Sequence, residues 1–276
     1  MSMRHFKLLG MVVGLLAAFA ALSPVAHAEK PNPGYEQFAG CPSPFTENPK
    51  IVTCLRADIT GGNFKMGNKN VPIEKPIVIT GGVETGLKNF SANAEGGMTK
   101  VKQKVPGGII GLTGLTWLAE FLGIEALTLY ATTEPAGLPV FTDLNHVSLP
   151  IRVHLENTTG VLGKNCYVGS FTSPIKLNLT TGTTSPPPPN TPITGKEGEV
   201  SFDPVLEIFR SKNAVFVDNS FSAPGASGCV LTLFGFIPIS INGLVNTQSG
   251  LPAPAGTNET KQTTSTELVN SEFAYE

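Results

Sequence analysis

The sequence has few charged residues and no excess of positive charge. Asp, Glu, Lys and Arg make up 14% of its 276 residues, and the formal net charge at pH 7 is −2. A chain of this kind has no electrostatic reason to bind nucleic acid or anionic lipid. Glycine and proline are plentiful instead, with 30 and 23 residues, which favours strands joined by many turns over long helices.

Residues that often carry catalysis are scarce. Beyond residue 28 the chain has two histidines, His146 and His154, and its one tryptophan is Trp117. The Gly-x-Ser-x-Gly pattern of α/β-hydrolases is missing, because Gly225–Cys229 lacks the final glycine. We therefore assign no catalytic, cofactor-binding or metal-binding residue from the sequence, and we expect no cofactor.

The apolar run near the N-terminus is too short to span a bilayer. Leu8–Leu22 carries no charge, but it is 15 residues long where a spanning helix needs about 20. Arg4 and Lys7 precede it, and Ala26–Ala28 is a small-x-small cleavage site. These features predict a signal peptide over residues 1–28 and a protein that is secreted or held at the cell surface. An uncleaved anchor is the alternative.

All four cysteines follow the expected cleavage site. An even number of cysteines in an exported chain predicts disulfides. Of the three possible pairings we favour Cys41 with Cys54 and Cys166 with Cys229, because each pair then lies within one region of the sequence. Loop entropy predicts about 3 kcal/mol of stabilisation from the short bridge and about 4 kcal/mol from the long one. A thiolate metal site is the alternative, but the chain has no Cys-x-x-Cys.

Alternating apolar and polar residues predict strands. The clearest pattern is Val147–Glu156, in which Pro150 cannot donate a backbone hydrogen bond and so predicts an edge strand or a bulge. The same alternation runs over Ile175–Thr180 and Leu127–Thr132. Shorter apolar runs bounded by turn residues predict four more strands, at Ile77–Thr80, Ala214–Val217, Val230–Phe234 and Ile237–Ile241. We therefore expect an all-β fold, mainly an antiparallel sandwich or barrel-like sheet, with long Gly/Pro-rich loops.

One segment has a helical period instead. In Thr113–Leu122 the leucines fall on one side, and Gly123 is placed to end the helix. This predicts one short helix in the β-rich body.

The mature chain, residues 29–276, is expected to form a single domain. A sub-boundary is possible near residues 100–112, where small and apolar residues concentrate. Residues 181–199 contain four consecutive prolines, which favour an extended segment. Because the Cys166–Cys229 bridge would enclose this segment, we interpret it as a proline-rich loop on one domain.

Several strings of residues, spread over most of the mature chain, are specific enough to indicate a family. They are Val105–Gly108, Asn165–Ser170, Leu177–Ser185, Asp218–Phe221, Ser227–Gly235 and Gly250–Ala253. With these strings the chain resembles a group of exported actinobacterial proteins of unknown function. The resemblance implies the exterior of a bacterial cell, and therefore that the sequons at Asn89, Asn157, Asn178 and Asn258 are not glycosylated. It assigns no activity.

The first hypothesis for function is a non-enzymatic extracellular protein that binds or coats an unidentified ligand of the cell envelope or its surroundings. Export, strands, cystines, low charge and scarce catalytic groups motivate it. It involves no nucleic acid and no stable membrane span in the mature chain.

Two alternatives come from other classes. An extracellular hydrolase would use Glu120 or Glu125 as an acid, or His146 with Asp143. A membrane-inserting protein would use the apolar stretch Ile109–Leu129, which follows a run of alternate lysines ending at Lys104.

Overall fold

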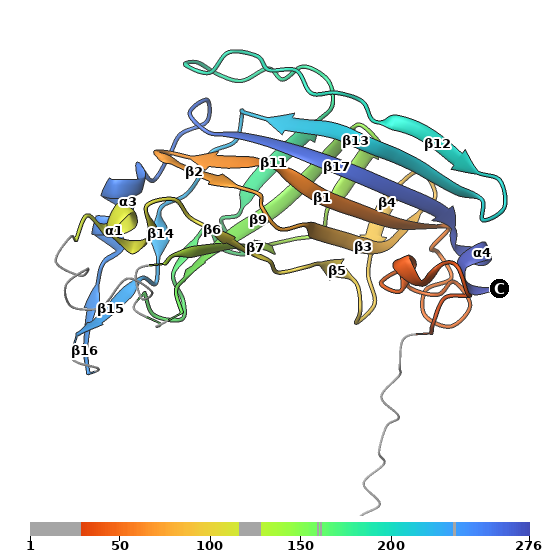
Figure 1. The fold of residues 1–276 in the computed structure, drawn as a ribbon, viewed down its shortest axis with the longest axis horizontal. Coiled ribbons are helices and arrows are strands. Elements are labelled where there is room, and N and C mark those ends of the chain that lie inside the picture. Colours follow the sequence, from red (N-terminus) through yellow and green to blue (C-terminus); the bar gives the residue numbers. More distant parts are fainter. Residues whose placement is uncertain (1–28, 116–127, 159, 161, 234–235) are drawn as a thin grey trace, which may run out of the picture.

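The structure, a computed structural model, describes residues 29–115, 128–158, 160, 162–233 and 236–276. The expected signal peptide lies outside the described residues, and so do Trp117, Glu120 and Glu125. The described part is built on one large, curled antiparallel sheet, with a small two-stranded sheet and short helices at its ends (Figure 1). The predicted all-β, barrel-like fold is confirmed.

The large sheet has 15 strands within the described residues. In chain order these are β1 (Thr53–Met66), β2 (Lys69–Pro72), β3 (Ile77–Glu84), β4 (Lys88–Ser91), β5 (Gly97–Met98), β6 (Lys102–Lys104), β7 (Tyr130–Pro135), β8 (Val140–Asp143), β9 (His146–Glu156), β10 (Tyr167–Val168), β11 (Ile175–Thr180), β12 (Glu199–Asp203), β13 (Ile208–Asp218), β14 (Ala226–Ser227) and β17 (Glu259–Asn270). Strands β15 (Val230–Leu233) and β16 (Ile237–Ser240) form the separate hairpin.

The sheet curls so that two of its regions face each other. Its main path runs β14-β10-β9-β11-β13-β17-β1-β3-β4. Strands β11 and β13 are paired only through Thr180 and Val217, and beyond this point β9 and β11 lie across from β1 and β17 (Figure 1). Ile151 of β9 and Ile59 of β1 line the same internal cavity, which shows that the two regions enclose one core.

Strand β9 shows why alternation predicts the fold. Its odd-numbered residues from Leu149 to Leu155 are buried, as expected for one inward face. The prediction that Pro150 marks an edge strand or a bulge is wrong, because β9 is an interior strand in regular register with β11. Pro150 lies opposite the gap between β7 and β8, where its carbonyl accepts the N–H of Ala136 at 2.9 Å. Its missing N–H faces the same gap, so no ladder bond is lost.

The two longest strands, β1 and β17, pair along most of their lengths and were not expected from the sequence. Their residues alternate weakly or are polar on both faces. A bulge between Ile59 and Gly61 changes which residues of β1 point inward, from odd to even positions. Gly62 has φ +112°, and a Cβ there would lie 1.9 Å from the Lys261 carbonyl oxygen, so glycine is required.

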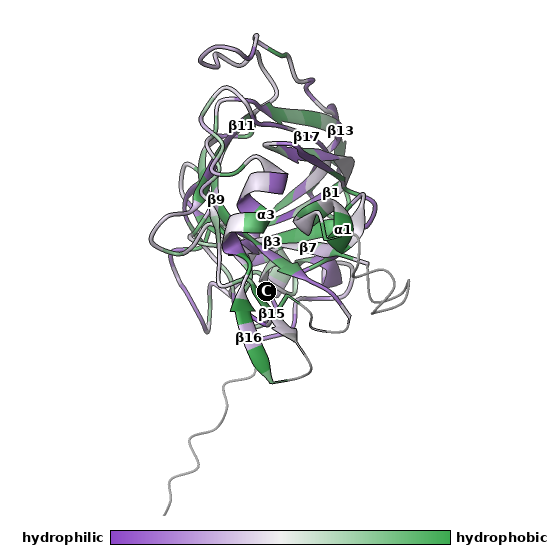
Figure 2. Ribbon diagram, turned by 90° about the vertical axis from the view of Figure 1, so that its left-hand side faces the viewer, coloured by the Kyte–Doolittle hydropathy of each residue, from purple (hydrophilic) through white to green (hydrophobic). Residues whose placement is uncertain are grey.

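The described helices are short. Helix α1 (Gly108–Thr113) ends where the predicted helix Thr113–Leu122 was expected to begin, because Gly114 adopts the left-handed conformation. Residues 116–122 lie outside the described residues. Helix α3 (Asn242–Ser249) packs beside α1 at one end of the sheet (Figure 2), and α4 (Ser271–Tyr275) lies at the other. Within the described part of the chain, no helix is long and apolar enough to cross a membrane.

Both disulfides join the pairs favoured from the sequence, Cys41 with Cys54 and Cys166 with Cys229. The short bridge belongs to a small second core that includes Phe38 of the 3-10 turn η1 (Glu36–Phe38) and Tyr275 of α4. The Tyr275 hydroxyl donates to the Cys41 carbonyl, and the Asn32 N–H donates to the Ala274 carbonyl at 2.8 Å. The two ends of the described part of the chain are thereby joined.

The proline-rich loop, residues 181–199, rises above the sheet at the far side from this core (Figure 1). It lies within the ring closed by Cys166 and Cys229. The side-chain amide of Asn190 holds it down by donating to the carbonyls of Asn219 and Asn258, at 2.9 and 2.8 Å. The loop therefore returns to the sheet beside the start of β17.

Candidate binding cavity

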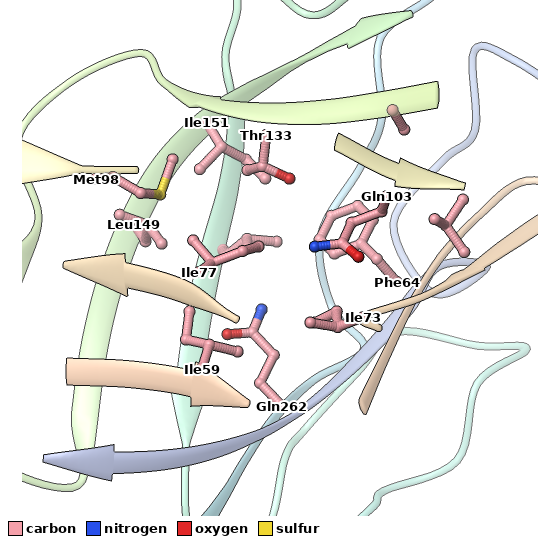
Figure 3. A pocket seen from close by; sticks show the side chains of 13 residues that line it. Ile59, Phe64, Ile73, Ile77, Met98, Gln103, Thr133, Leu149, Ile151 and Gln262 are labelled. Carbon is pink, nitrogen blue, oxygen red and sulfur yellow. The ribbon is translucent and has the colours of Figure 1, made fainter. Parts of the chain in front are cut away.

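Two adjoining cavities lie inside the curl of the sheet. Their volumes are about 40 and 60 Å³, and they share Ile59, Leu149 and Gln262 as lining residues. Figure 3 shows the first of them with its side chains converging from opposite strands. Each volume exceeds the 10–15 Å³ that a single water requires.

The lining of the first cavity is almost wholly apolar. Its residues come from β1, β2, β3, β5, β6, β7, β9, β11 and β17 and from the turn after β2. They are Ile59, Phe64, Val71, Ile73, Ile77, Met98, Gln103, Ala131, Thr133, Leu149, Ile151, Leu177 and Gln262. Because the inward positions of so many strands meet here, the site depends on closure of the whole sheet.

The second cavity leads toward the surface. It is lined by residues including Ala57 and Phe141, and it shares Leu144, Phe216 and Thr266 with an outer cavity of about 160 Å³. Leu144 is 40% exposed. Asn145 and Glu197, whose side chains are joined by a 3.2 Å hydrogen bond, also line the outer cavity. Neighbouring cavities thus share lining residues, from the partly exposed Leu144 to the buried Gln262.

The interior has two unlike sides. Strands β9 and β11 contribute an apolar wall, which consists of Leu149, Ile151, Val153, Leu177 and Leu179, all buried. Strand β17 contributes a polar stripe, which consists of Thr260, Gln262, Thr264 and Thr266 at every second position. Thr260, Gln262 and Thr264 are between 0 and 6% exposed, so the polar stripe is enclosed with the apolar residues.

Gln262 occupies the centre of the polar stripe. In the sheet register it lies between Gly62 of β1 and Phe216 of β13, and Gly62 offers no side chain beside it. Its amide group points into the first cavity (Figure 3). Among the described residues, its Oε1 has no hydrogen-bond partner.

The other glutamine of the first cavity, Gln103, has its hydrogen bonds satisfied. Its Oε1 accepts the backbone N–H groups of Glu74 and Lys75 at 2.9 and 3.1 Å, and its Nε2 donates to the Lys75 carbonyl at 2.7 Å. Gln103 therefore fixes the chain before β3 to strand β6. Of the two amide oxygens, only that of Gln262 has no partner among the described residues.

Of the residues considered for catalysis, the structure brings His146 and Asp143 together. The His146 Nδ1 lies 2.9 Å from an Asp143 carboxylate oxygen, and a hydrogen bond from this ring lowers the pKa of Asp143. Both side chains are more than half exposed, and Asp143 also accepts the N–H of Asn145. The pair therefore stabilises the turn between β8 and β9 and does not lie in an enclosed site.

His154 lies on the polar face of β9, and its side chain is 17% exposed. Its ring stacks on Tyr167 at 4.5 Å between centroids, and its Nε2 lies 3.1 Å from the Lys164 carbonyl oxygen. Two cross-strand ion pairs lie beside it. Arg152 pairs with Glu134 of β7 at 2.6 Å, and Lys102 of β6 pairs with Glu156 at 2.8 Å.

These ion pairs determine the protonation of the two carboxylates. Burial by itself would raise the pKa of Glu134, but hydrogen bonds from Arg152 and Lys100 outweigh it and hold the pKa below its ordinary value. The pKa of Glu156 is lowered in the same way, since Lys102 and Thr132 outweigh burial. Both groups thus stabilise the outer face of β9 as carboxylates.

Searches for metal sites and for relatives give no assignment. Within the described residues, no three His, Cys, Asp or Glu side chains are grouped so that they could hold a metal ion. No family model, curated protein or solved structure matches the chain. The candidate site therefore depends on the geometry of the cavities alone.

The sequence analysis identified none of the polar residues that line the cavities. Gln103 and Gln262 lie in segments whose apolar residues follow no clear period. The spacing of apolar residues therefore cannot show whether these segments form interior strands or surface strands. The one usable signal was composition. Glu259–Asn270 contains no Gly or Pro and is rich in Thr, which is typical of a strand.

Proposed function

We propose that this protein is an exported, non-enzymatic binding protein that holds a small, largely apolar molecule inside its curled sheet. The observation that carries the proposal is the enclosed apolar cavity formed by inward residues of nine strands. Binding sites for small molecules are typically concave, mostly apolar and equipped with a few placed polar groups. The cavities inside the sheet have this composition.

The disulfides support the compartment. Two cystines fit an oxidising environment outside the cytoplasm. Secretion or attachment at the cell surface is part of the proposal, with the ligand drawn from the cell envelope or its surroundings. Cell fractionation tests it: recovery of a chain that still begins at Met1 in the cytosol would contradict it.

Binding is tested by titrating the ¹⁵N-labelled mature protein with octan-1-ol and following its amide chemical shifts. We expect the shifts to be concentrated at residues around Ile59 and Leu149. The substitution Ala57→Leu, which places a larger side chain in the second cavity, should weaken binding. The matched substitution Ala94→Leu, at an exposed position, should not. Saturable shifts in both variants with equal affinity would contradict the internal site.

An extracellular hydrolase remains the second candidate because His146 and Asp143 are in contact. In such an enzyme His146 would act as the base and Asp143 would orient its ring. A screen of ester, peptide and glycoside substrates tests this candidate: turnover that is lost in His146→Ala would favour the hydrolase over the binding protein.

A further inference from the structure

We infer that the ligand is an aliphatic molecule with a hydroxyl group, and that this hydroxyl donates a hydrogen bond to Oε1 of Gln262. The inference rests on the proposed function and specifies the chemical class of its ligand. It follows from the orientation of one buried amide, from the apolar surfaces around it and from the form of the cavities.

The orientation of the Gln262 amide is determined by its neighbours. The Thr260 hydroxyl donates to the Asn63 carbonyl oxygen at 2.9 Å. A hydroxyl has one proton, so Thr260 can then only accept from Gln262. The group that faces Thr260, at 3.2 Å, must therefore be the amide nitrogen Nε2. The amide oxygen is left on the other side.

That oxygen lies in an environment where a missing partner is costly. Gln262 is 5% exposed, and its Oε1 has no hydrogen-bond partner in the part of the chain that the structure describes. Buried carbonyl oxygens are paired in the great majority of native structures. An acceptor left open in an apolar cavity is suited to a ligand that brings a donor.

The surroundings decide the rest of the ligand. Gln262 lines both inner cavities, whose other shared residues, Ile59 and Leu149, are aliphatic. Gln103 offers no free acceptor, because its Oε1 already accepts the backbone N–H groups of residues 74 and 75. An alkyl chain with one hydroxyl matches the apolar part of this lining and the one amide oxygen that is open.

The form of the cavities favours a slender molecule. The outer cavity shares Leu144 with the second, the second shares Gln262 with the first, and the inner two have volumes of only about 60 and 40 Å³. An unbranched chain can occupy such a series with its hydroxyl at Gln262 and its alkyl part between the polar stripe and the apolar wall.

Two ligands of the same atomic composition test the inference. Octan-1-ol has a hydroxyl donor, whereas 1-methoxyheptane has an ether oxygen that can only accept. We expect the wild-type protein to bind the alcohol about five- to tenfold more tightly than the ether, as one added hydrogen bond implies. In Gln262→Leu the two affinities should become equal, since the acceptor is gone. The matched substitution Gln248→Leu, at an exposed glutamine that lines neither inner cavity, should preserve the difference.

The outcomes separate the inference from the proposed function. Equal binding of alcohol and ether by the wild-type protein would overturn the role of Gln262 and leave an apolar binding protein. A preference for the alcohol that survives in Gln262→Leu would also overturn it. Failure of the wild-type protein to bind either molecule would overturn the inference and the proposed function together. Because the wild-type comparison is itself decisive, the test does not depend on the folding of the variant.

Discussion

The two sides of the interior achieve burial in different ways. The apolar wall on β9 and β11 follows strict alternation, and every inward residue is aliphatic. The polar stripe on β17 buries threonines and a glutamine at the same depth. Both regions are central in the sheet and have neighbouring strands on each side. Position in the fold therefore does not explain the difference in composition.

The difference in composition shows which part of the interior is less favourable for stability. Burying apolar surface contributes about 25 cal/mol per Å², whereas a buried acceptor without a partner costs about 1–3 kcal/mol. Natural proteins depart from the stable solution mainly at functional sites. The apolar wall stabilises the fold of the sheet. The polar stripe is the candidate for the binding function.

The largest expected effect concerns the bridge beside the apolar wall. Replacing Cys166 and Cys229 with serine should lower the free energy of unfolding by about 4 kcal/mol, because the bridge closes a long loop. Replacing Cys41 and Cys54, which lie beside the end of β17, should cost about 3 kcal/mol. Urea denaturation of the two double variants measures both values. A larger loss at the short bridge would contradict the order set by loop length.

A substitution in the apolar wall comes next. Leu177 is 1% exposed, so Leu177→Ala should lower the free energy of unfolding by about 3 kcal/mol through lost burial and a new cavity. The neighbouring substitution Lys176→Ala, on the exposed side of β11, should change it by less than about 0.5 kcal/mol. Chemical denaturation compares them. Similar losses in both variants would show that β11 does not bury one face as described.

Acid should weaken the outer face of β9. The pKa values of Glu134 and Glu156 are lowered in the folded protein, so their contribution is complete above the ordinary pKa of 4.5 and is lost as the pH falls below it. We expect the melting temperature to fall in this range. Glu134→Gln should lower stability at pH 7 by about 2 kcal/mol and flatten the acid limb.

The exposed residue Glu199 on β12 provides the control for this pH profile. Glu199→Gln should retain the acid limb of the wild-type protein, because none of the ion pairs in the described part of the chain involves Glu199. An unchanged limb in Glu134→Gln would show that other groups govern acid unfolding.

The smallest expected effect has the opposite sign. Gln262→Leu should raise the free energy of unfolding of the ligand-free protein by about 1 kcal/mol, because it removes a buried acceptor that has no partner in the described residues. Thermal and urea unfolding measure this change. A loss of stability would indicate that the amide contributes to folding and is not reserved for a ligand.

The same contrast explains how much the sequence could predict. The apolar wall was predicted from alternation, because apolar and polar residues alternate along a strand that is buried on one face only. The disulfide pairs were favoured by proximity in sequence, and the structure contains them. Strand β17 has polar residues on both faces, so no period reveals it, and its place depends on pairing with β1 about 200 residues earlier.

The cavity could not be predicted for a related reason. Its lining comes from strands scattered between Ile59 and Gln262, and only the curl of the sheet brings them together. The edge position expected for Pro150 was wrong, because a proline also fits an interior strand where the adjacent strand is interrupted. The alternation of residues within a strand shows which of its faces is buried. It does not show which strands face each other.

The pairing of β1 with β17 has a consequence for biogenesis. A ribosome releases Thr53 long before it adds Asn270, yet these two residues are opposite each other in the ladder. The β1–β17 ladder, the complete small core around Phe38 and the Asn32–Ala274 hydrogen bond can form only after nearly all of the polypeptide has emerged. Such distant partners make folding slow, and the edge of β1 that faces β17 must stay unpaired until then, although its other edge can pair with β3 earlier. The sheet therefore keeps an open edge on β1 until β17, its last strand in chain order, has been made.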